Sequence, residues 1–110
     1  TSDMIVTGGY NVYPREVEDA LAAHPAAREV VVVGIPDDKW GEAVAAFVAL
    51  RAGEGADDAA LMAFARERLA GYKVPKSVHF IDEVPKSPVG KLLRRAVRDP
   101  FWQGRDRRIG

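Results

Sequence analysis

The sequence contains no cysteine and only two histidines, His24 and His79, which lie far apart in the chain. Without cysteine there is no disulfide framework, no thiolate metal site and no thiol nucleophile. Two distant histidines lack the close ligand spacing that is typical of a zinc site. The sequence therefore predicts neither a metal centre nor catalysis by a cysteine.

Long apolar stretches are also missing. The longest apolar run covers residues 43–50, whereas a membrane-spanning helix needs about 20 apolar residues. The first residues show no pattern of a secretory signal peptide. We therefore expect a cytoplasmic protein without a membrane span.

The 110 residues are 47% hydrophobic and 29% charged, which is typical of one globular domain with a modest core. The formal net charge is zero, but it is unevenly distributed. Residues 1–85 contain 8 basic and 14 acidic side chains, whereas residues 86–110 contain 8 and 2. Such a basic segment meets a polyanionic ligand or lies on its own acidic domain, and both interpretations stay open.

Alternating or continuous apolar patterns indicate five extended segments. They cover residues 3–7, 10–13, 30–35, 43–50 and 77–81. The four valines in the third segment are typical of a strand that is buried on both faces. The second segment follows the first after two glycines, which predicts a short N-terminal β-hairpin.

Three helices are expected between these strands. Pro14 suits the first position of one helix, and Asp57 or Asp58 suits the N-cap of a second helix that ends near Gly71. A short third helix is expected over residues 91–98. Together the elements predict a small α+β domain: a three-stranded sheet plus the hairpin, flanked by two main helices and a short third helix.

Two loops combine residues that suit a ligand. Gly8 and Gly9 permit positive φ angles or a close approach of the backbone to a bound molecule. Tyr72 stands beside Lys73 and Lys76, a combination that suits stacking on a base and contact with phosphates. A plain basic loop explains the second pattern equally well.

The most distinctive loop covers residues 85–91, Pro-Lys-Ser-Pro-Val-Gly-Lys. Its two prolines exclude a helix interior and a central strand. We expect a stiff loop that presents Lys91 at the start of the third helix, where an anion is attracted. It is not a Walker loop, because Pro85 and Leu92 replace the required glycine and hydroxyl residue. A solvated lysine after a turn is the competing interpretation.

Trp40 stands in a polar turn over residues 36–42. It is an anchor of that loop or a flat wall for a ligand channel. No nucleophile and base stand at a spacing that supports a complete catalytic site. The residues alone predict no more than a small α+β domain that supplies a lysine, and a loop that suits phosphate, to a larger site.

Two long motifs connect the chain to a known family. Residues 3–18, Asp-Met-Ile-Val-Thr-Gly-Gly-Tyr-Asn-Val-Tyr-Pro-Arg-Glu-Val-Glu, resemble the start of the C-terminal domain of acyl-CoA synthetases in the adenylate-forming superfamily. Residues 85–95 resemble the last core motif of that family, and residues 34–37 and 40–42 also fit. The motifs have the family's order and spacing and cover nearly the whole chain.

The resemblance implies an AMP-forming acid–thiol ligase of the fatty-acid or aryl-acid CoA type. A carboxylate attacks the α-phosphate of ATP, which is bound with magnesium, and gives an acyl-adenylate and pyrophosphate. The C-terminal domain then rotates, and the thiol of CoA displaces AMP. The family places the lysine that matches Lys91 near the carboxylate and α-phosphate in the first step.

For the second step, the resemblance implies a pantetheine tunnel and contacts to the CoA nucleotide from Gly8, Gly9, Trp40, Tyr72, Lys73 and Lys76. The hinge of the rotation falls at Ser2 and Asp3. Three positions depart from the family pattern. Ser2 replaces an aspartate or lysine, Tyr10 replaces an acidic or polar residue, and Val74 replaces a basic residue that some relatives carry.

The resemblance also implies that residues 1–110 are one mobile domain of a longer polypeptide, whose larger N-terminal domain binds most of ATP and the acyl group. We expect the isolated chain to be inactive, and we expect no nucleic-acid partner. One alternative is the C-terminal lobe of an adenylation domain that acts with a carrier protein. The other is a non-catalytic nucleotide- or polyanion-binding module, which predicts binding with a steep salt dependence.

Overall fold

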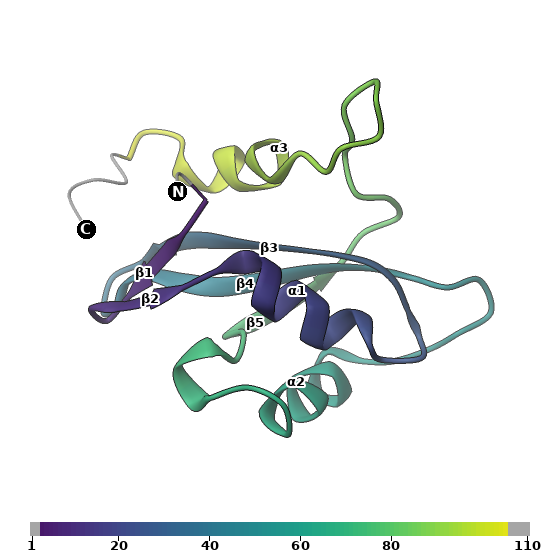
Figure 1. The fold of residues 1–110 in the computed structure, drawn as a ribbon. Coiled ribbons are helices and arrows are strands. Elements are labelled where there is room, and N and C mark those ends of the chain that lie inside the picture. The colour runs from purple at the N-terminus through teal and green to yellow at the C-terminus, as the bar shows by residue number, and fades with distance from the viewer. Residues whose placement is uncertain (1–2, 106–110) are drawn as a thin grey trace.

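A mixed five-stranded sheet forms the centre of the chain in the computed structural model, which describes residues 3–105 (Figure 1). The strands are β1 (Ile5–Thr7), β2 (Tyr10–Val12), β3 (Ala27–Asp37), β4 (Gly41–Leu50) and β5 (Ser77–Phe80). The sheet runs β2-β1-β4-β3, and β5 pairs with β4 in parallel. The N-terminal hairpin joins the three-stranded sheet through the pair Thr7 and Gly41.

The antiparallel pair of β3 and β4 is the longest element of the sheet. Its register runs from Ala27 opposite Leu50 to Asp37 opposite Gly41. The connection between Asp37 and Gly41 is a tight turn, because one carboxylate organises it. Oδ1 of Asp37 accepts the N–H groups of Lys39 at 2.9 Å and Trp40 at 2.8 Å.

Both faces of the sheet are covered, as the run of valines predicts. Val30 and Val32 face helices α1 (Pro14–Ala22) and α2 (Asp58–Arg66), whereas Val31 and Val33 lie in a second cluster under α3 (Arg94–Arg98). Figure 1 shows α3 on the opposite side of the sheet from α2. Full burial of each valine contributes about 1.5–3 kcal/mol, so the two clusters hold the layers together.

Helices α1 and α2 begin where the sequence predicts, but α2 ends earlier than predicted. Pro14 opens α1, and Oδ1 of Asp57 accepts the N–H of Ala60 at 2.8 Å to cap α2. Helix α2 ends at Arg66 and does not reach Gly71, because the N–H of Arg68 bonds the carbonyl of Ala65 three residues earlier, at 3.0 Å, in a tightened final turn. A 3₁₀ helix over Gly71–Lys73 then leads towards β5.

The expectation that Lys91 begins the third helix is wrong. Helix α3 begins at Arg94, and Leu92 forms an isolated antiparallel bridge with Lys86. The N–H of Ser87 donates to the carbonyl of Lys91 at 2.8 Å, so Lys91 closes a hairpin-like loop. A second 3₁₀ helix, Asp99–Trp102, continues from α3. The α+β class with two main helices and a short third is confirmed.

Candidate functional site

Four of the residues that sequence motifs assign to ligand binding lie around one small hollow. We call this hollow the aromatic pocket; it has a volume of about 140 Å³ and is lined by Thr7, Gly8, Tyr10, Trp40, Tyr72 and Lys76. Three turns of the chain meet there: the β1–β2 turn, the β3–β4 turn and the 3₁₀ helix that follows α2. The pocket therefore depends on the packing of segments that are distant in the sequence.

Gly8 forms the floor of the pocket against Trp40. Its N–H donates to the carbonyl of Trp40 at 2.9 Å, and its φ is +56°. A side-chain carbon at Gly8 would lie 2.7 Å from Cε3 of the indole, which leaves no room for one. Gly9 has a φ of +85° and no atom within 4 Å of its side-chain position, so its backbone is open to solvent.

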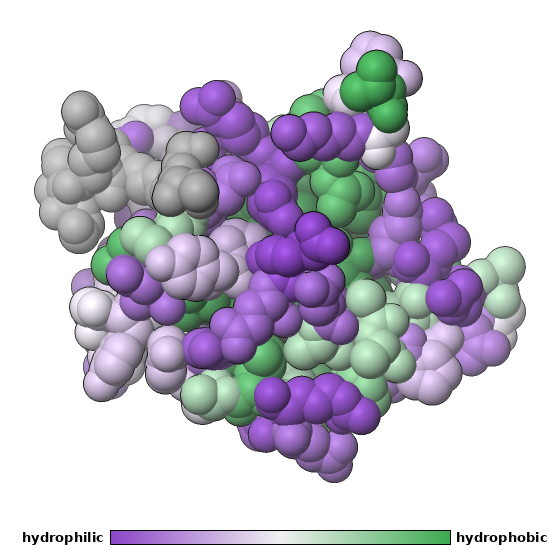
Figure 2. Space-filling view, viewed as in Figure 1, coloured by the Kyte–Doolittle hydropathy of each residue, from purple (hydrophilic) through white to green (hydrophobic). Residues whose placement is uncertain are grey.

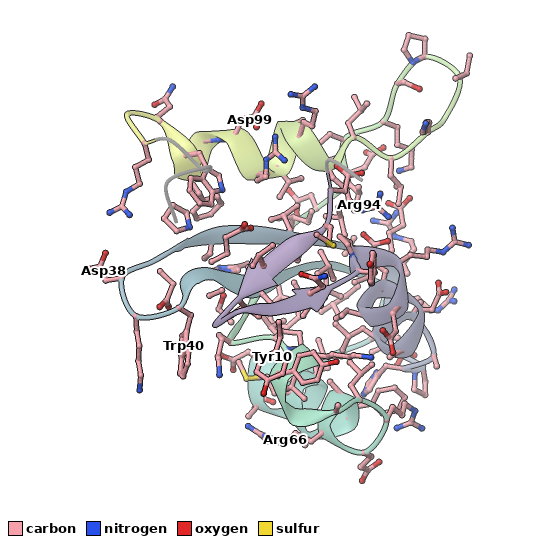
Figure 3. The ribbon with its side chains drawn as sticks, turned by 60° about the vertical axis from the view of Figure 1, so that its left-hand side comes forward. Tyr10, Asp38, Trp40, Arg66, Arg94 and Asp99 are labelled. Carbon is pink, nitrogen blue, oxygen red and sulfur yellow. The ribbon has the colours of Figure 1, made fainter. Side chains whose placement is uncertain are left out.

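Aromatic rings form the walls. Tyr10 and Tyr72 are stacked with ring centroids 4.7 Å apart and an interplanar angle of 28°. Figure 3 shows Trp40 and Tyr10 on the side of the sheet that α2 covers. Trp40 and Tyr72 each remain 40% exposed. The rings are therefore held by the fold while their outer faces are free to contact a bound molecule.

The three lysines near the pocket differ in their surroundings. Nζ of Lys76 lies 5.7 Å from the Trp40 ring centroid, and Nζ of Lys39 lies 4.7 Å from it. Lys73 does not line the pocket; its ammonium donates to Oε2 of Glu16 at 2.9 Å. This hydrogen bond raises the pKa of Lys73 above its ordinary value. The charge of Lys73 is thus already paired, whereas Lys76 faces the pocket.

Lys91 lies in a separate surface loop, residues 85–93, which we call the Lys91 loop. Figure 1 shows this loop projecting beyond the sheet, at the opposite end from the β1–β2 turn. Gly90, with a φ of +86°, donates its N–H to the carbonyl of Ser87 at 2.8 Å. Lys91 is exposed, and within residues 3–105 its ammonium has no hydrogen-bond acceptor.

The tip of the Lys91 loop is apolar, as the space-filling view in Figure 2 shows. Val89 is 90% exposed there. The base of the loop is anchored by charge: Nζ of Lys86 lies 2.5 Å from Oε2 of Glu29 and donates to the carbonyl of Val84 at 3.2 Å. The bond from Lys86 holds the pKa of Glu29 below its ordinary value of 4.5, against the opposing effect of burial.

Several basic residues from the C-terminal quarter pair with acids of the domain body. Lys86 contacts Glu29, Arg94 contacts Glu18 and Asp3, and Arg105 lies 3.9 Å from Asp38. These ion pairs support the interpretation in which the basic segment lies on its own acidic domain. Lys91 is not among these paired residues.

The sequence missed part of the site. In the sequence, Tyr10 stands out only as a departure from the family pattern. Its position directly after Gly8 and Gly9 is the signal that an aromatic ring lies at this turn. Glu16 and Arg94 were not singled out. His24 lies two residues beyond the end of α1, and its Nδ1 accepts the N–H of Ala26 at 3.0 Å. The ring of His79 stacks on Phe47, with the ring centroids 4.7 Å apart.

Of the two residues at which the resemblance places a hinge, Ser2 lies outside the described residues and Asp3 contacts Arg94. Residues 3–105 contain no group of three or more metal-ligating side chains. In the same part of the chain, no helix is long and apolar enough to cross a membrane.

Curated relatives of the chain carry ligase names. The chain is 59% identical over 95 residues to a long-chain-fatty-acid–CoA ligase of Bacillus subtilis, and 49% identical over 115 residues to the medium/long-chain-fatty-acid–CoA ligase FadD8 of Mycobacterium tuberculosis. It is 46% identical over 107 residues to the fatty acid–[acyl-carrier-protein] ligase ScoC of Streptomyces coeruleorubidus. These alignments cover 86%, 98% and 97% of the chain but only 17%, 20% and 21% of the relatives. The chain thus spans about a fifth of the length of these proteins.

Solved structures agree in fold. A Mycobacterium tuberculosis fatty acyl CoA synthetase matches with a TM-score of 0.85 and 39% identity, over 96% of the chain and 21% of that protein. The ATP-bound MatB of Rhodopseudomonas palustris matches with a TM-score of 0.86 and 35% identity, over 90% and 20%. The family described as the AMP-binding enzyme C-terminal domain matches residues 16–91. As the two sequence motifs predict, the chain belongs to this family of C-terminal domains of AMP-binding enzymes.

Proposed function

We propose that the chain is the mobile C-terminal domain of an ATP-dependent acyl-CoA ligase. The complete ligase converts a carboxylic acid, ATP and CoA into an acyl-CoA, AMP and pyrophosphate through an acyl-adenylate. The N-terminal domain of the same polypeptide holds most of ATP, its magnesium and the acyl group. We propose the cytoplasm as the location, because ATP and CoA are supplied there.

The observation that carries the proposal is the separation of the two candidate surfaces. The Lys91 loop and the β1–β2 turn lie at opposite ends of the domain (Figure 1). A single rotation can present first one surface and then the other to the same partner domain. One domain then serves two half-reactions. The hinge for this rotation falls at Ser2 and Asp3.

Lys91 serves the first half-reaction in this proposal. An oxygen of the carboxylate attacks the α-phosphorus of ATP, and the bond to pyrophosphate breaks. Negative charge gathers on the α-phosphate oxygens and the leaving group as this occurs. An ammonium group that is exposed and has no acceptor within residues 3–105 is available to stabilise that charge.

The aromatic pocket and the glycine turn serve the second half-reaction. The sulfur of CoA attacks the acyl carbonyl carbon, the bond to AMP breaks, and the thiol proton is lost. Gly9 has open space where a side chain would stand, which suits a narrow channel for pantetheine. The exposed rings of Trp40 and Tyr72 and the ammonium of Lys76 suit the remainder of the CoA molecule.

The test uses the full-length protein and separates the half-reactions. One assay follows carboxylate-dependent pyrophosphate exchange, and the other supplies acyl-adenylate and CoA and follows thioester formation. We expect Lys91→Ala to lower the first rate by roughly 100- to 1,000-fold, as for loss of one preorganised charge partner, and to leave the second near wild type. Arg95→Ala, an exposed change on α3, is the matched control. Pyrophosphate exchange that survives in Lys91→Ala contradicts the proposal.

A carrier protein is the alternative acceptor, and the similarity to ScoC favours testing it. In that case the acyl-adenylate is transferred to the pantetheine thiol of a folded protein. The same thioester assay with free CoA and with a phosphopantetheinylated carrier protein separates the two. If the carrier protein is preferred, it replaces free CoA as the acceptor in the proposal, and the role of Lys91 is unchanged.

A further inference from the structure

We infer that Arg94 is a positioning residue that joins the hinge-side segment at Asp3 and the Lys91 loop into one rigid body through Glu18. The inference rests on the proposed function, because it concerns how the rotation delivers Lys91. Figure 3 shows Arg94 where the start of α3 meets the segment that leads into β1.

The centre of this arrangement is the carboxylate of Glu18 on α1, which is 5% exposed. Arg94 donates to it twice, from Nε to Oε2 at 2.8 Å and from Nη2 to Oε1 at 2.6 Å. Oε2 also accepts the N–H of Val32 in β3 at 3.0 Å. One carboxylate therefore fastens α1, β3 and the start of α3, and its burial depends on the guanidinium beside it. The same hydrogen bonds raise the pKa of Arg94, which keeps its charge at all relevant pH values.

The third nitrogen of Arg94 reaches the N-terminal segment. Nη1 donates to Oδ2 of Asp3 at 3.3 Å. Asp3 follows Ser2 directly and enters β1 two residues later. Asp3, one of the two proposed hinge residues, is thus fixed to the domain body, so we infer that the rotation occurs on the N-terminal side of Asp3. A lysine has a single nitrogen and does not reproduce this three-way contact.

Arg94 lies three residues after Lys91, and the intervening backbone is fixed. The N–H of Leu93 donates to the carbonyl of Pro85 at 3.0 Å, and Leu92 is bridged to Lys86. A shift of Arg94 therefore moves residues 91–93, the C-terminal side of the Lys91 loop. The aromatic pocket is lined by residues of other segments, and Arg94 is not among them. Loosening Arg94 affects the placement of Lys91 while the surface for the thioester step is retained.

The experiment compares Arg94→Lys with Arg95→Lys, a neighbouring exposed position, in the full-length protein. Arg94→Lys should lower pyrophosphate exchange by roughly 10- to 100-fold, because a misplacement of about 1 Å suffices for such a loss. Thioester formation from supplied acyl-adenylate should stay within about twofold of wild type, as should both rates in Arg95→Lys. Equal loss of both half-reactions in Arg94→Lys overturns the inference, since that result reports general damage to the domain.

Hydrogen exchange gives a readout that does not depend on activity. The amides of Val32 and Leu93 should exchange about tenfold or more faster in Arg94→Lys, because one bonds Glu18 directly and the other closes the loop beside Arg94. Faster exchange with undiminished pyrophosphate exchange assigns Arg94 a purely structural role and overturns the inference. Failure of the proposed function is recognised separately, by an active Lys91→Ala variant.

A milder variant tests the contact between Arg94 and Asp3, and it covers the case in which Arg94→Lys does not fold. Asp3→Asn removes only the negative charge from the outer contact, whose two side chains are 23% and 35% exposed. It should lower pyrophosphate exchange by about threefold, and the double variant should be no slower than Arg94→Lys alone, as for residues that act through one contact. If Asp3→Asn leaves pyrophosphate exchange unaffected, the contact between Arg94 and Asp3 does not help to place Lys91, and this part of the inference is overturned. The same conclusion follows if the losses of the two single variants multiply in the double variant.

Discussion

Gly8 and Trp40 hold each other in place. The N–H of Gly8 donates to the carbonyl of Trp40 at 2.9 Å, and a side-chain carbon at Gly8 would meet Cε3 of the indole at 2.7 Å. The missing side chain of one residue is thus the space that the ring of the other occupies. This pair connects the β1–β2 turn with the β3–β4 turn, and both residues line the aromatic pocket.

Gly8→Ala should therefore displace Trp40 and, under the proposed function, impair the thioester step of the full-length protein. The φ of +56° adds about 1–2 kcal/mol of backbone strain for a residue with a side chain. We expect a several-fold rise in the KM for CoA and a lower melting temperature, with pyrophosphate exchange near wild type. Thioester kinetics and a thermal melt of the same preparation provide the measurement.

Two other glycines distinguish the effect of backbone strain from the effect of displacing Trp40. Gly53 has a φ of +78° and nothing within 4 Å of its side-chain position, so Gly53→Ala should lower stability alone. Gly9→Ala has the same backbone strain and the same open space in this domain. If Gly9→Ala loses thioester activity and Gly53→Ala does not, the added methyl group at Gly9 must contact a bound molecule or a domain outside this chain. Wild-type CoA kinetics in Gly8→Ala would contradict the role given to the pocket.

If the proposed function holds, Lys73 and Lys76 should contribute unequally to CoA binding by the full-length protein. The ammonium of Lys73 is 2.9 Å from the carboxylate of Glu16, whereas Lys76 lines the pocket. Lys76→Ala should raise the KM for CoA about fivefold or more, as for loss of a hydrogen bond to a charged group. Lys73→Ala should raise it less than about twofold, because its charge is already paired. Initial rates at varied CoA concentration measure both.

Glu16→Gln is the matched test of this explanation. It removes the partner of Lys73 and lets its pKa return towards the ordinary value. The freed ammonium should then be available to phosphate groups, so the KM for CoA should stay the same or fall. Equal effects of Lys73→Ala and Lys76→Ala in the wild-type background would show that the Glu16 pair does not limit Lys73.

Local signals in the sequence predicted much of the fold. Proline at the first position of α1, the Asp57 cap of α2 and the valines of β3 act within a few residues, and all three are confirmed. The end of α2 was predicted too late, because a glycine signal at Gly71 competed with a turn that closes at Ala65.

Contacts between distant residues account for what the sequence did not predict. Lys73 and Glu16 are 57 residues apart, and Arg94 and Glu18 are 76 apart, so no local pattern pairs them. Lys91 was placed at a helix start because the residues after it are good helix formers. Its carbonyl instead accepts the N–H of Ser87, a backbone contact across the loop that outweighs this propensity.

The ion pair of Glu29 and Lys86 should make stability depend on pH. The bond from Lys86 lowers the pKa of Glu29 below 4.5, so this stabilisation is present above that pH. It is lost as the pH falls through the lowered pKa. Glu29→Gln should therefore be less stable than wild type by about 0.5–1 kcal/mol at pH 7, and the difference should shrink below about pH 4.

Urea unfolding at pH 7 and at pH 3 measures this dependence. Glu67→Gln is the control, because Glu67 pairs with Arg68 at the surface and its side chain is 75% exposed. That variant should match wild type at both pH values within error. A constant difference between Glu29→Gln and wild type across this range would attribute the effect to packing rather than to charge.

Gly34 interrupts the apolar run of β3, and its neighbours explain why. A side-chain carbon at this position would overlap Oε1 of Glu42, which is 6% exposed, and would lie 3.0 Å from Cγ2 of Ile5. Gly34→Ala should therefore destabilise the domain by about 1–3 kcal/mol through overpacking. Gly55→Ala, with nothing within 4 Å, is the matched control and should be close to neutral.

A double-variant cycle tests whether Glu42 causes this loss. Glu42→Ala vacates the space above Gly34, so Gly34→Ala should cost less stability in that background than in the wild type. Urea midpoints and slopes of the four proteins give the coupling energy. If the loss is the same in both backgrounds, the carboxylate of Glu42 is not the obstacle, and the contact with Ile5 must account for it. If Gly34→Ala is neutral, β3 relaxes enough to accept a side chain, and glycine at this position is not required by packing.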